Sequence, residues 1–457
     1  MQKEVELHGT PKETTETRNE SSVWMTFFEE TTLHGARFLA KRSLIRRIVW
    51  AIFLLMATVT CLVMITYSVI DYYHYPVQTK VGIEYRRSLR FPAVTICNVN
   101  RYKKSKIIKN QTLMSLLHYI SPLPASLKND INRSDPLLPI VLNTTKTDSL
   151  ISMAGYSVDD MFWSCFWKNH AINCSEAFTT TFTSMGRCFT FNSNGSLTAE
   201  RTGSSSGLWL RMKLQHEEYT PGFALSAGVK ALLHEPYEVP LVHEQGFAVS
   251  AGYEALVAIR MTQIIGQALP YRGIDCIDTK ASAFRNPLKF YPTYSLSGCI
   301  YECQARYVND VCDCTLFYHP GGYRRCNVWE ALVCVSKSLV SFMQNTMIET
   351  RCGCKPPCYQ TLYSSQLSHL SYPNEPTLQQ LKKFNYTEEY LKKEFLEMRL
   401  FYQQMNYDII EQSPKYYFAQ LIGDIGGLMG IFVGSSFLTI CEFGDFLFLL
   451  LKRKFRK

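Results

Sequence analysis

The stretch Tyr416–Leu451, YYFAQLIGDIGGLMGIFVGSSFLTICEFGDFLFLLL, is long and apolar enough to cross a lipid bilayer, since about 20 residues suffice for a membrane-spanning helix. It differs from a plain anchor because three acids, Asp424, Glu442 and Asp445, lie within it. A charged side chain at membrane depth is costly unless it faces water or a partner. A single acid near the end of a span can simply reach the membrane surface, but three acids favour a helix that lines an aqueous path.

Small residues are the second unusual feature of this stretch. Gly426, Gly430 and Gly434 recur every four residues, a spacing that lets helix backbones approach closely. Gly434 is followed by Ser435 and Ser436, so small polar residues interrupt the apolar sequence. Glycine and serine are common packing residues in membrane helices, but together with the acids they predict a helix that packs against copies of itself around a narrow pore.

A second apolar block, Ile48–Ile70, contains 23 residues without a charge and predicts another membrane-spanning helix. Basic residues cluster just before this block and just after the first-quoted stretch, so the positive-inside rule places both termini in the cytosol. These flanks supply much of the net charge of +9, which suits an anionic membrane surface and requires no nucleic acid. The predicted segments are a cytosolic N-terminus (1–47), a first span (48–70), an extracellular domain (71–415), a second span (416–451) and a cytosolic C-terminus (452–457).

The cysteines agree with this topology. Of 16 cysteines, Cys61 and Cys441 lie in the predicted spans, and the other 14 lie in the predicted extracellular domain, as expected for disulfides in an oxidising compartment. Ten of them crowd into residues 276–358 and indicate a disulfide-stapled helical subdomain rather than a zinc site, although the sequence alone does not give the pairing. Six N-x-S/T sequons are predicted glycosylation sites: Asn110, Asn132, Asn143, Asn173, Asn194 and Asn385.

The centre of the extracellular region is predicted to be rich in β-strands. Apolar runs and alternating patterns indicate strands, and residues 377–405, which are rich in charge, are expected to be helical. The predicted strands are Phe91–Asn98, Arg187–Phe191, Leu208–Leu214, Phe247–Val249 and Ala255–Met261.

Motifs of catalysis or metal binding are weak. Gly203–Gly207 matches the G-x-S-x-G pattern only formally, because it lacks the strand–turn–helix context of a nucleophile elbow. His216, His234 and His243 lack metal-ligand spacing. We therefore predict neither an enzyme nor a metal site.

Several motifs together resemble a known family. They are His34-Gly35 before the first span, YHYP and FPAVTICN after it, CFTFN at Cys188–Asn192, the cysteine-dense block, NYDIIEQ at Asn406–Gln412, and GDIGGLMGIFVGSS followed by LTICEFGDF. From about Thr31 onward the chain resembles the degenerin and epithelial sodium channel superfamily, most closely its acid-sensing, bile-acid-sensitive and neuropeptide-gated branches.

The resemblance implies an α+β membrane protein of the plasma membrane. Each subunit would have two transmembrane helices and a large disulfide-rich extracellular domain, with a β-ball and palm core and helical finger, thumb and knuckle parts. Three subunits, identical or related, would surround a central pore. The implied disulfides are Cys97–Cys188, Cys165–Cys174, Cys276–Cys358, Cys299–Cys354, Cys303–Cys352, Cys312–Cys334 and Cys314–Cys326.

The resemblance also implies residue roles in the pore. Gly434, Ser435 and Ser436 match the selectivity filter, where small residues at a helix break bring backbone groups close to the ion path. Asp424 matches an acid near the outer gate, and Glu442 and Asp445 match acids that would form rings of negative charge on the inner side. His34 and Gly35 match a cytosolic re-entrant loop, and the implied gating positions are His34, Gly35, Gln420, Tyr72 and Tyr271.

The sequence departs from the acid-sensing branch at positions linked to the stimulus. Gly82 and Ile83, beside Lys80, stand where that branch has an acidic pair, and Tyr271 stands in place of a tryptophan. His74, Asp408 and Glu411 are candidate proton sensors, since histidine titrates near neutral pH. We therefore expect an amiloride-sensitive sodium or cation channel opened by an extracellular neuropeptide, with protons as the alternative agonist.

Other classes stay open at this point. An ATP-gated trimer shares the two-span topology, but the cysteine block and the Gly-Ser-Ser run argue against it. A glycosylated adhesion or receptor protein without conductance is a distant alternative, and a surface enzyme is the least favoured. No cofactor is expected; Na⁺ is the expected permeant ion, Ca²⁺ a candidate modulator, and membrane lipid a further partner.

Overall fold

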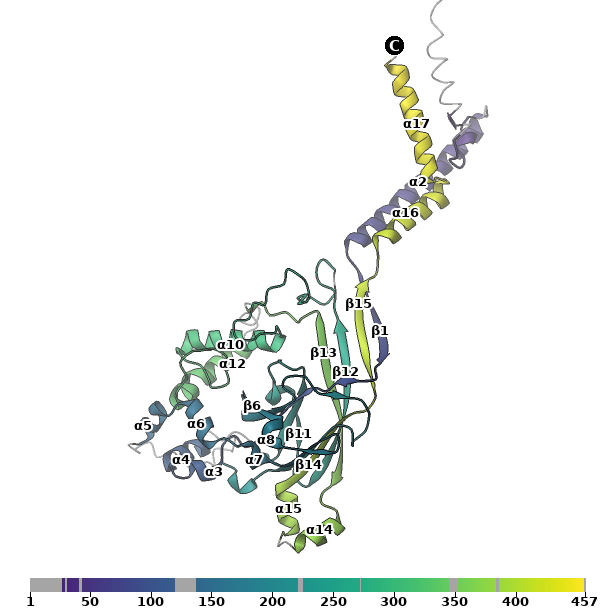
Figure 1. The fold of residues 1–457 in the computed structure, drawn as a ribbon. Coiled ribbons are helices and arrows are strands. Elements are labelled where there is room, and N and C mark those ends of the chain that lie inside the picture. Colours follow the sequence, from purple (N-terminus) through teal and green to yellow (C-terminus); the bar gives the residue numbers. More distant parts are fainter. Residues whose placement is uncertain are drawn as a thin grey trace, which may run out of the picture. The chain divides into compact units, whose positions relative to one another are not determined.

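A computed structural model describes residues 27–28, 31–40, 43–119, 137–220, 225–271, 273–344, 352–383 and 386–455 (Figure 1). The predicted sequons at Asn132 and Asn385 lie outside the described residues. The chain divides into two compact units. The smaller unit comprises residues 1–78, 270–273 and 413–457, and the larger unit comprises residues 79–269 and 274–412.

An eight-stranded sheet forms the centre of the larger unit. Its longest strand, β12, pairs in antiparallel fashion with β13 over its whole length, and in parallel with β14 and β15. The sheet thus joins segments that are far apart in the sequence. Its order is β1 (Val77–Tyr85), β15 (Asn406–Pro414), β12 (Tyr253–Ile265), β14 (Phe395–Tyr402), β9 (Leu208–Lys213), β4 (Phe162–Trp167) and β5 (His170–Ile172), with β13 (Tyr359–Ser371) also on β12.

A second sheet has five strands, and two further short strands form a separate two-stranded sheet. The Cys97–Cys188 disulfide joins two residues that are register partners on β3 and β7. The five strands run in the order β11 (Phe247–Val249), β10 (Val229–His234), β3 (Ala93–Asn98), β7 (Gly186–Phe191) and β6 (Phe178–Thr183), and the short pair is β2 (Leu89–Arg90) with β8 (Thr198–Ala199).

Side chains from both sheets form one hydrophobic core. On β9, Leu208, Leu210 and Met212 are fully buried, whereas the alternate residues Trp209 and Arg211 are only partly buried. This is the period-2 pattern of a half-buried strand, and it places a strand where the sequence predicted one. The partners of Leu210 in the core include Ile96 on β3 and Met398 on β14.

Helices surround the sheets of the larger unit. Ser295 caps the N-terminus of α10, because its hydroxyl accepts a hydrogen bond from the Gly298 amide at 3.0 Å. The elements are α3 (Lys104–Ile107), α4 (Gln111–Tyr119), α5 (Leu137–Thr144), α6 (Thr147–Ala154), α7 (Val158–Met161), α8 (Cys174–Ala177), η3 (His216–Glu218), α9 (Val242–Gln245), α10 (Leu296–Cys312), α11 (Val328–Glu330), η4 (Ala331–Val335), α12 (Ser336–Gln344), α14 (Glu375–Lys382) and α15 (Glu388–Glu394).

All seven disulfides have the pairing that the family resemblance implied. Five of them lie within residues 276–358, which we call the disulfide block. The Cys276–Cys358 disulfide joins the two ends of the block. Three of the other four attach cysteines of α10 to residues later in the block, and the fourth joins Cys314 to Cys326. Crosslinks of this kind restrict the unfolded chain and so stabilise the folded block.

The expectation of helix across residues 377–405 was wrong in its last part. Residues Phe395–Tyr402 form β14 rather than helix. Two of the charged residues that suggested helix, Glu397 and Arg399, lie on β14 itself and form ion pairs with the neighbouring strands β9 and β12, which enclose β14 in the sheet. Burial of Leu396, Met398 and Leu400 on this strand outweighs their helix propensity.

The smaller unit is helical. It contains η1 (Ala36–Phe38), α2 (Leu44–Tyr73), α16 (Phe418–Val433) and α17 (Phe437–Lys454). Helix α2 has 30 residues and a mean hydropathy of 2.7 in its most apolar window, enough to cross a membrane, and α16 packs along it. Helices α16 and α17 are bent by 72° across the break between them. Large apolar side chains on α2, such as Leu55 and Leu62, are more than half exposed, as expected for a surface that meets lipid.

Replacing Leu210 by alanine tests the central core. We expect Leu210→Ala to cost about 2–5 kcal/mol of stability, the usual range for a buried leucine. The exposed Leu269, at 76% exposure, gives a matched control in which Leu269→Ala is expected to have little effect. Thermal unfolding of the purified full chain, followed by size-exclusion chromatography, measures both, and equal melting temperatures for the two variants would contradict the assigned core.

Candidate functional site

The Gly-Ser-Ser run ends one helix and starts the next. Gly434 has φ of 68° and follows α16 in the left-handed conformation, which glycine adopts readily. Its amide donates to the Gly430 carbonyl at 3.0 Å, and the Ser435 amide donates to the Met429 carbonyl at 3.1 Å. The bond from the Gly434 amide to the Gly430 carbonyl is the 5→1 bond of an αL helix end.

The start of α17 is capped by the next residues. The Ser436 amide donates to Thr439 Oγ1 at 3.0 Å, and the Thr439 amide donates to Ser436 Oγ at 3.4 Å. Such a reciprocal cap satisfies amides that the first helical turn leaves unpaired. The local sequence therefore encodes the break, and the predicted filter residues lie at its centre.

The segment around His34 lies directly on this break. The His34 amide donates to the Val433 carbonyl at 3.1 Å, one of the carbonyls that the end of a helix leaves without a helical partner. A Cβ atom built on Gly434 would lie only 1.4 Å from His34 Nδ1. Glycine is thus required at position 434 for two independent reasons, its backbone conformation and the close approach of the histidine ring.

Gly35 allows the same segment to turn toward α2. It has φ of 82°, and a Cβ atom there would lie 3.3 Å from the Trp50 ring. Phe38 stacks on Trp50 with ring centroids 4.3 Å apart. The His34-Gly35 segment therefore contacts both helices that the sequence predicts to cross the membrane.

Two threonines attach the same segment to α17. Thr31 Oγ1, the Thr32 amide and Thr32 Oγ1 all donate to Glu442 Oε2, at 3.1, 3.1 and 3.3 Å. Thr32 Oγ1 also lies 2.8 Å from Thr439 Oγ1. We call these contacts, together with the bond from His34 to Val433, the N-terminal clasp. The sequence suggested a charged ring for Glu442, but the structure shows this carboxylate accepting hydrogen bonds from its own chain.

Aromatic contacts extend the clasp, whereas Asp445 stays outside it. The Phe27 ring stacks on Phe446 at 4.2 Å and meets Phe443 edge-on at 5.0 Å. Asp445 is exposed. Although Glu442 and Asp445 are three residues apart, the structure gives them different surroundings.

At the other end of α16, three predicted pore and gating residues, Tyr72, Gln420 and Asp424, each contact Tyr416 or Tyr417. The Tyr416 hydroxyl donates to the Asp424 carboxylate, and the Tyr72 ring lies 6.2 Å from the Tyr416 ring. Gln420 Oε1 accepts the Tyr417 amide at 2.9 Å and so caps α16. Gln420 thus has a local role at the helix start.

The predicted proton sensors are exposed and lie in different units. His74 ends α2 in the smaller unit, where the neighbouring Tyr75 ring meets the Tyr271 ring at 5.7 Å. Asp408 and Glu411 lie on β15 in the larger unit. All three titratable side chains are exposed.

A pair of carboxylates that the sequence did not reveal lies in the larger unit. Glu235 and Glu238 line a cavity of about 430 Å³ that also touches the start of α10 and the start of β13. Glu238 accepts a hydrogen bond from Ser297 Oγ at 3.3 Å, and Glu235 pairs with Arg90 at 2.7 Å. Burial raises the pKa of Glu238, and the negative charge of Glu235 adds to the effect. Both side chains are partly buried, and we call Glu235 and Glu238 the buried acid pair.

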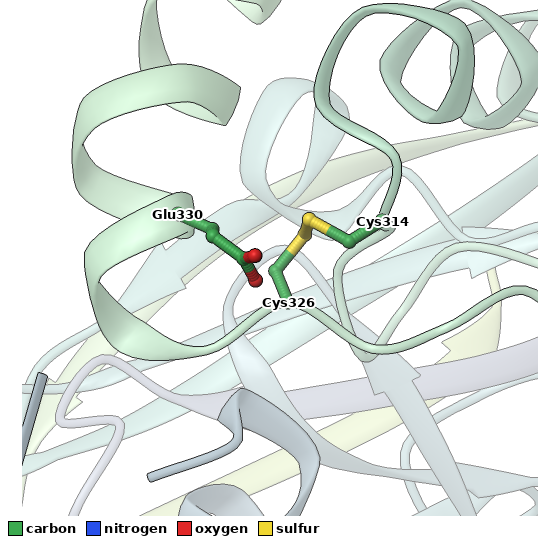
Figure 2. Close-up of side chains that lie close together, drawn as sticks. All are labelled: Cys314, Cys326 and Glu330. Atoms are coloured by element: carbon green, nitrogen blue, oxygen red, sulfur yellow. A yellow bond between two sulfur atoms is a disulfide. The ribbon is translucent and has the colours of Figure 1, made fainter. Parts of the chain in front are cut away.

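One cluster looks like a metal site but is a disulfide. Figure 2 shows Glu330 next to the sulfur atoms of Cys314 and Cys326, which are 2.08 Å apart. Bonded sulfurs are not thiolates, and a metal needs the thiolate as ligand. The Glu330 carboxylate pairs with Arg324 at 2.9 Å and accepts the Asn327 amide at 2.9 Å. The cluster is therefore a structural joint of the disulfide block.

The exposure of the sequons is compatible with glycosylation. Asn110, Asn143, Asn173 and Asn194 are the sequon asparagines that the structure describes, and all four are exposed. Their modification stays a prediction.

Comparison with known proteins identifies the family. The family described as "Amiloride-sensitive sodium channel" matches residues 27–446. The chain belongs to this family. Members of this amiloride-sensitive sodium channel family are plasma-membrane ion channels built from homo- or heterotrimers of related subunits. The chain is accordingly a sodium channel of the family and not an enzyme.

Curated relatives are similar over nearly the whole chain. Acid-sensing ion channel 2 of Rattus norvegicus is 31% identical over 94% of this chain and 86% of its own length. Acid-sensing ion channel 1 of Gallus gallus is 30% identical over 94% and 84%, and acid-sensing ion channel 1C of Danio rerio is 29% identical over 98% and 87%. A solved structure of a proton-activated chloride channel aligns at 6% identity over 89% of this chain and 97% of its own, with a TM-score of 0.35.

Substitution of Gly434 tests the geometry of the break. We expect Gly434→Ala to abolish most of the current, because the backbone strain alone costs about 1 kcal/mol and the methyl group displaces His34. Adding His34→Gly removes the ring and should restore part of the current, measured by whole-cell recording at matched surface expression. Gly444→Ala, at a glycine with open space around it, is the control and should conduct normally. Failure of His34→Gly to restore any current would contradict the close approach.

A double-substitution cycle tests the contact between Thr32 and Glu442. We expect Thr32→Val and Glu442→Gln each to shift the agonist midpoint, and the double variant to shift it less than the sum, because both weaken one shared hydrogen bond, from Thr32 Oγ1 to Glu442 Oε2. Asp445→Asn removes an equal charge outside the clasp and should combine additively with Thr32→Val. Equal coupling for Glu442 and Asp445 would show that charge alone, and not the clasp, determines gating.

Proposed function

We propose that this chain is the subunit of a trimeric, amiloride-sensitive and sodium-selective channel of the plasma membrane, opened by extracellular protons. Each subunit would cross the membrane twice, through α2 and the bent pair α16–α17, with both termini in the cytosol. The single observation that supports a conducting role most strongly is the break at Gly434 with the N-terminal clasp seated on it. A lipid-facing anchor would require neither the break nor a second segment placed against it.

Assembly in threes would bring three breaks together. A Cβ atom built on Gly423, Gly426, Gly427 or Gly430 would meet no described atom within 4 Å beyond its chain neighbours and the adjacent backbone of its own helix, so α16 offers room for a neighbouring backbone. Backbone and hydroxyl groups of Gly434–Ser436 would then surround a narrow path suited to Na⁺. Rings of Asp424 and Asp445 would attract cations and repel anions, and Ca²⁺ is a candidate modulator at such rings.

Protons are the favoured agonist because the relatives are named acid-sensing channels and the buried acid pair supplies a titratable group. A carboxyl group with a raised pKa takes up a proton at a pH where an exposed one stays charged, so falling pH favours the arrangement in which Glu238 is buried against Ser297. The effect develops as pH falls from the raised pKa toward the ordinary value of 4.5. Burial lowers the pKa of His234 to about 4 and that of His319 to about 3, which excludes both as sensors near neutral pH.

A peptide agonist is the second candidate. The neuropeptide that the sequence favoured has no support from the names of the relatives, which point to protons. One observation still favours it: residues Lys80, Gly82 and Ile83 on β1 are exposed and provide no carboxylate where the acid-sensing branch has an acidic pair. A chain without that pair has less of the chemistry from which a proton sensor is built.

Currents from cells that express this chain alone test the proposal. An acid step should evoke a sodium current that amiloride blocks and that vanishes when external Na⁺ is replaced by a large organic cation. A current evoked by amidated peptides, but not by acid, would keep the channel and overturn the proton agonist. If neither stimulus evokes a current although the chain reaches the surface, coexpression with acid-sensing relatives tests an obligate partner. Continued absence of current on coexpression would favour a non-conducting receptor.

Glu238→Gln tests the buried acid pair directly. Glutamine is uncharged at every pH and should favour the buried arrangement without a proton. We therefore expect the pH response of Glu238→Gln to be shallower, with its midpoint closer to neutral pH, in whole-cell recordings over a series of acid steps. Glu389→Gln, at an exposed acid on α15, should leave the curve unchanged. Identical curves for Glu238→Gln and the wild-type chain would remove this pair from proton sensing.

A further inference from the structure

A cavity of about 330 Å³ lies where the helices of residues 104–154 meet the disulfide block. Its wall is mainly aliphatic: Leu113 and Leu150 come from α4 and α6, and Leu332 and Leu339 come from η4 and α12. The volume falls in the range of sites for small organic ligands, about 300–1,000 Å³. Neither the buried acid pair nor the clasp contributes to this wall.

The cavity wall also includes polar and basic side chains. Arg101 and His243 line it together with Ser184, and no aspartate or glutamate is among the described residues that do so. The Arg101 guanidinium donates to the Ser184 carbonyl. His243 Nδ1 lies 3.7 Å from a carboxylate oxygen of Glu244, which is outside the wall. An apolar wall with one guanidinium is complementary to a ligand that combines a hydrocarbon body with a single negative group.

The cavity borders a joint between the two helical parts. The Thr147 amide and Thr147 Oγ1 both donate to the Cys326 carbonyl at 3.1 Å, and the Val328 amide donates to the Thr145 carbonyl at 3.0 Å. Cys326 is also fixed to Cys314 by the disulfide in Figure 2. A molecule placed between α6 and η4 would therefore press on the joint that sets how the disulfide block meets residues 104–154.

We infer that this cavity binds an amphipathic carboxylate, with its aliphatic body among the four leucines and its carboxylate toward Arg101. Such a ligand stabilises the arrangement of the joint to which it binds more tightly. It alters channel opening only to the extent that its affinities for the closed and the open channel differ. The block can pass this change on, because Cys358 at its end accepts the Gly266 amide at 2.7 Å just after β12. The effect on current rests on the proposed function, whereas the binding does not.

Photolabelling of the full chain in intact cells tests the binding. The probe is a dodecanoate that carries a diazirine near the end of its chain, and labelled peptides are mapped by mass spectrometry. We expect label on α4, α6, η4 or α12, and a loss of at least fivefold in Leu332→Phe and in Leu150→Phe, which fill the cavity from opposite sides. Val340→Phe, at an exposed position on α12 outside the wall, should keep the label. Two filling variants are used so that a folding defect in one does not decide the result.

Competition with unlabelled molecules tests the charged end. Unlabelled dodecanoate should displace the probe about tenfold more effectively than dodecanol, since one charged hydrogen bond is worth about 1.5 kcal/mol. Label restricted to α2, α16 and α17, or label that persists in both filling variants, would overturn the site, and equal competition by acid and alcohol would overturn the assigned carboxylate. Because labelling needs no conductance, it can fail while acid still evokes a sodium current, and it can succeed in a chain that does not conduct.

Discussion

The structure of the smaller unit depends on the helix end at Gly434. A helix that stops in an apolar region leaves carbonyl groups without partners, and each unpaired group is costly there. The Gly434 amide satisfies the Gly430 carbonyl, and the N-terminal clasp supplies a further donor, the His34 amide, to the Val433 carbonyl. The clasp fits only because Gly434 has no side chain. One backbone conformation thus couples the two ends of the sequence.

This constraint gives the acids of the second apolar stretch separate roles. Asp424 contacts Tyr416 at the start of α16, Glu442 holds Thr31 and Thr32, and Asp445 stays exposed. Three carboxylates in one apolar stretch therefore have three different surroundings: a contact at the start of α16, the N-terminal segment, and an exposed position on α17. In the larger unit, the same division separates the buried acid pair from the exposed acids on β15.

Much of the fold was predictable from local patterns. The charge-free block at residues 48–70 predicted α2, the alternation of Leu208, Leu210 and Met212 predicted β9, and the family resemblance implied every disulfide pair. The break at Gly434 was also predictable, because glycine followed by two serines ends one helix and caps another. The apolar block, the alternating pattern and the break each depend on residues close together in the sequence. The disulfide pairs depend on motifs that can be recognised from the sequence.

The features that the sequence did not reveal depend on distant partners. Thr31 and Glu442 are 411 residues apart, and no periodicity connects them. Glu238 looks like an ordinary loop acid until Ser297 is placed against it. The sequence predicted helix at residues 395–402 because the strand β14 depends on pairing with its neighbours β9 and β12, which are distant in the sequence.

Cysteine substitution of Ser435 tests most directly whether the break at Gly434 lies on the ion path. The background is Cys441→Ser, because Cys441 is the exposed free cysteine among the described residues. External Cd²⁺, which binds thiolates, should block the agonist-evoked current of Ser435→Cys channels and leave the background channel unaffected. Equal Cd²⁺ sensitivity of the two channels, with Ser435→Cys conducting normally, would show that the break packs helices without lining the pore.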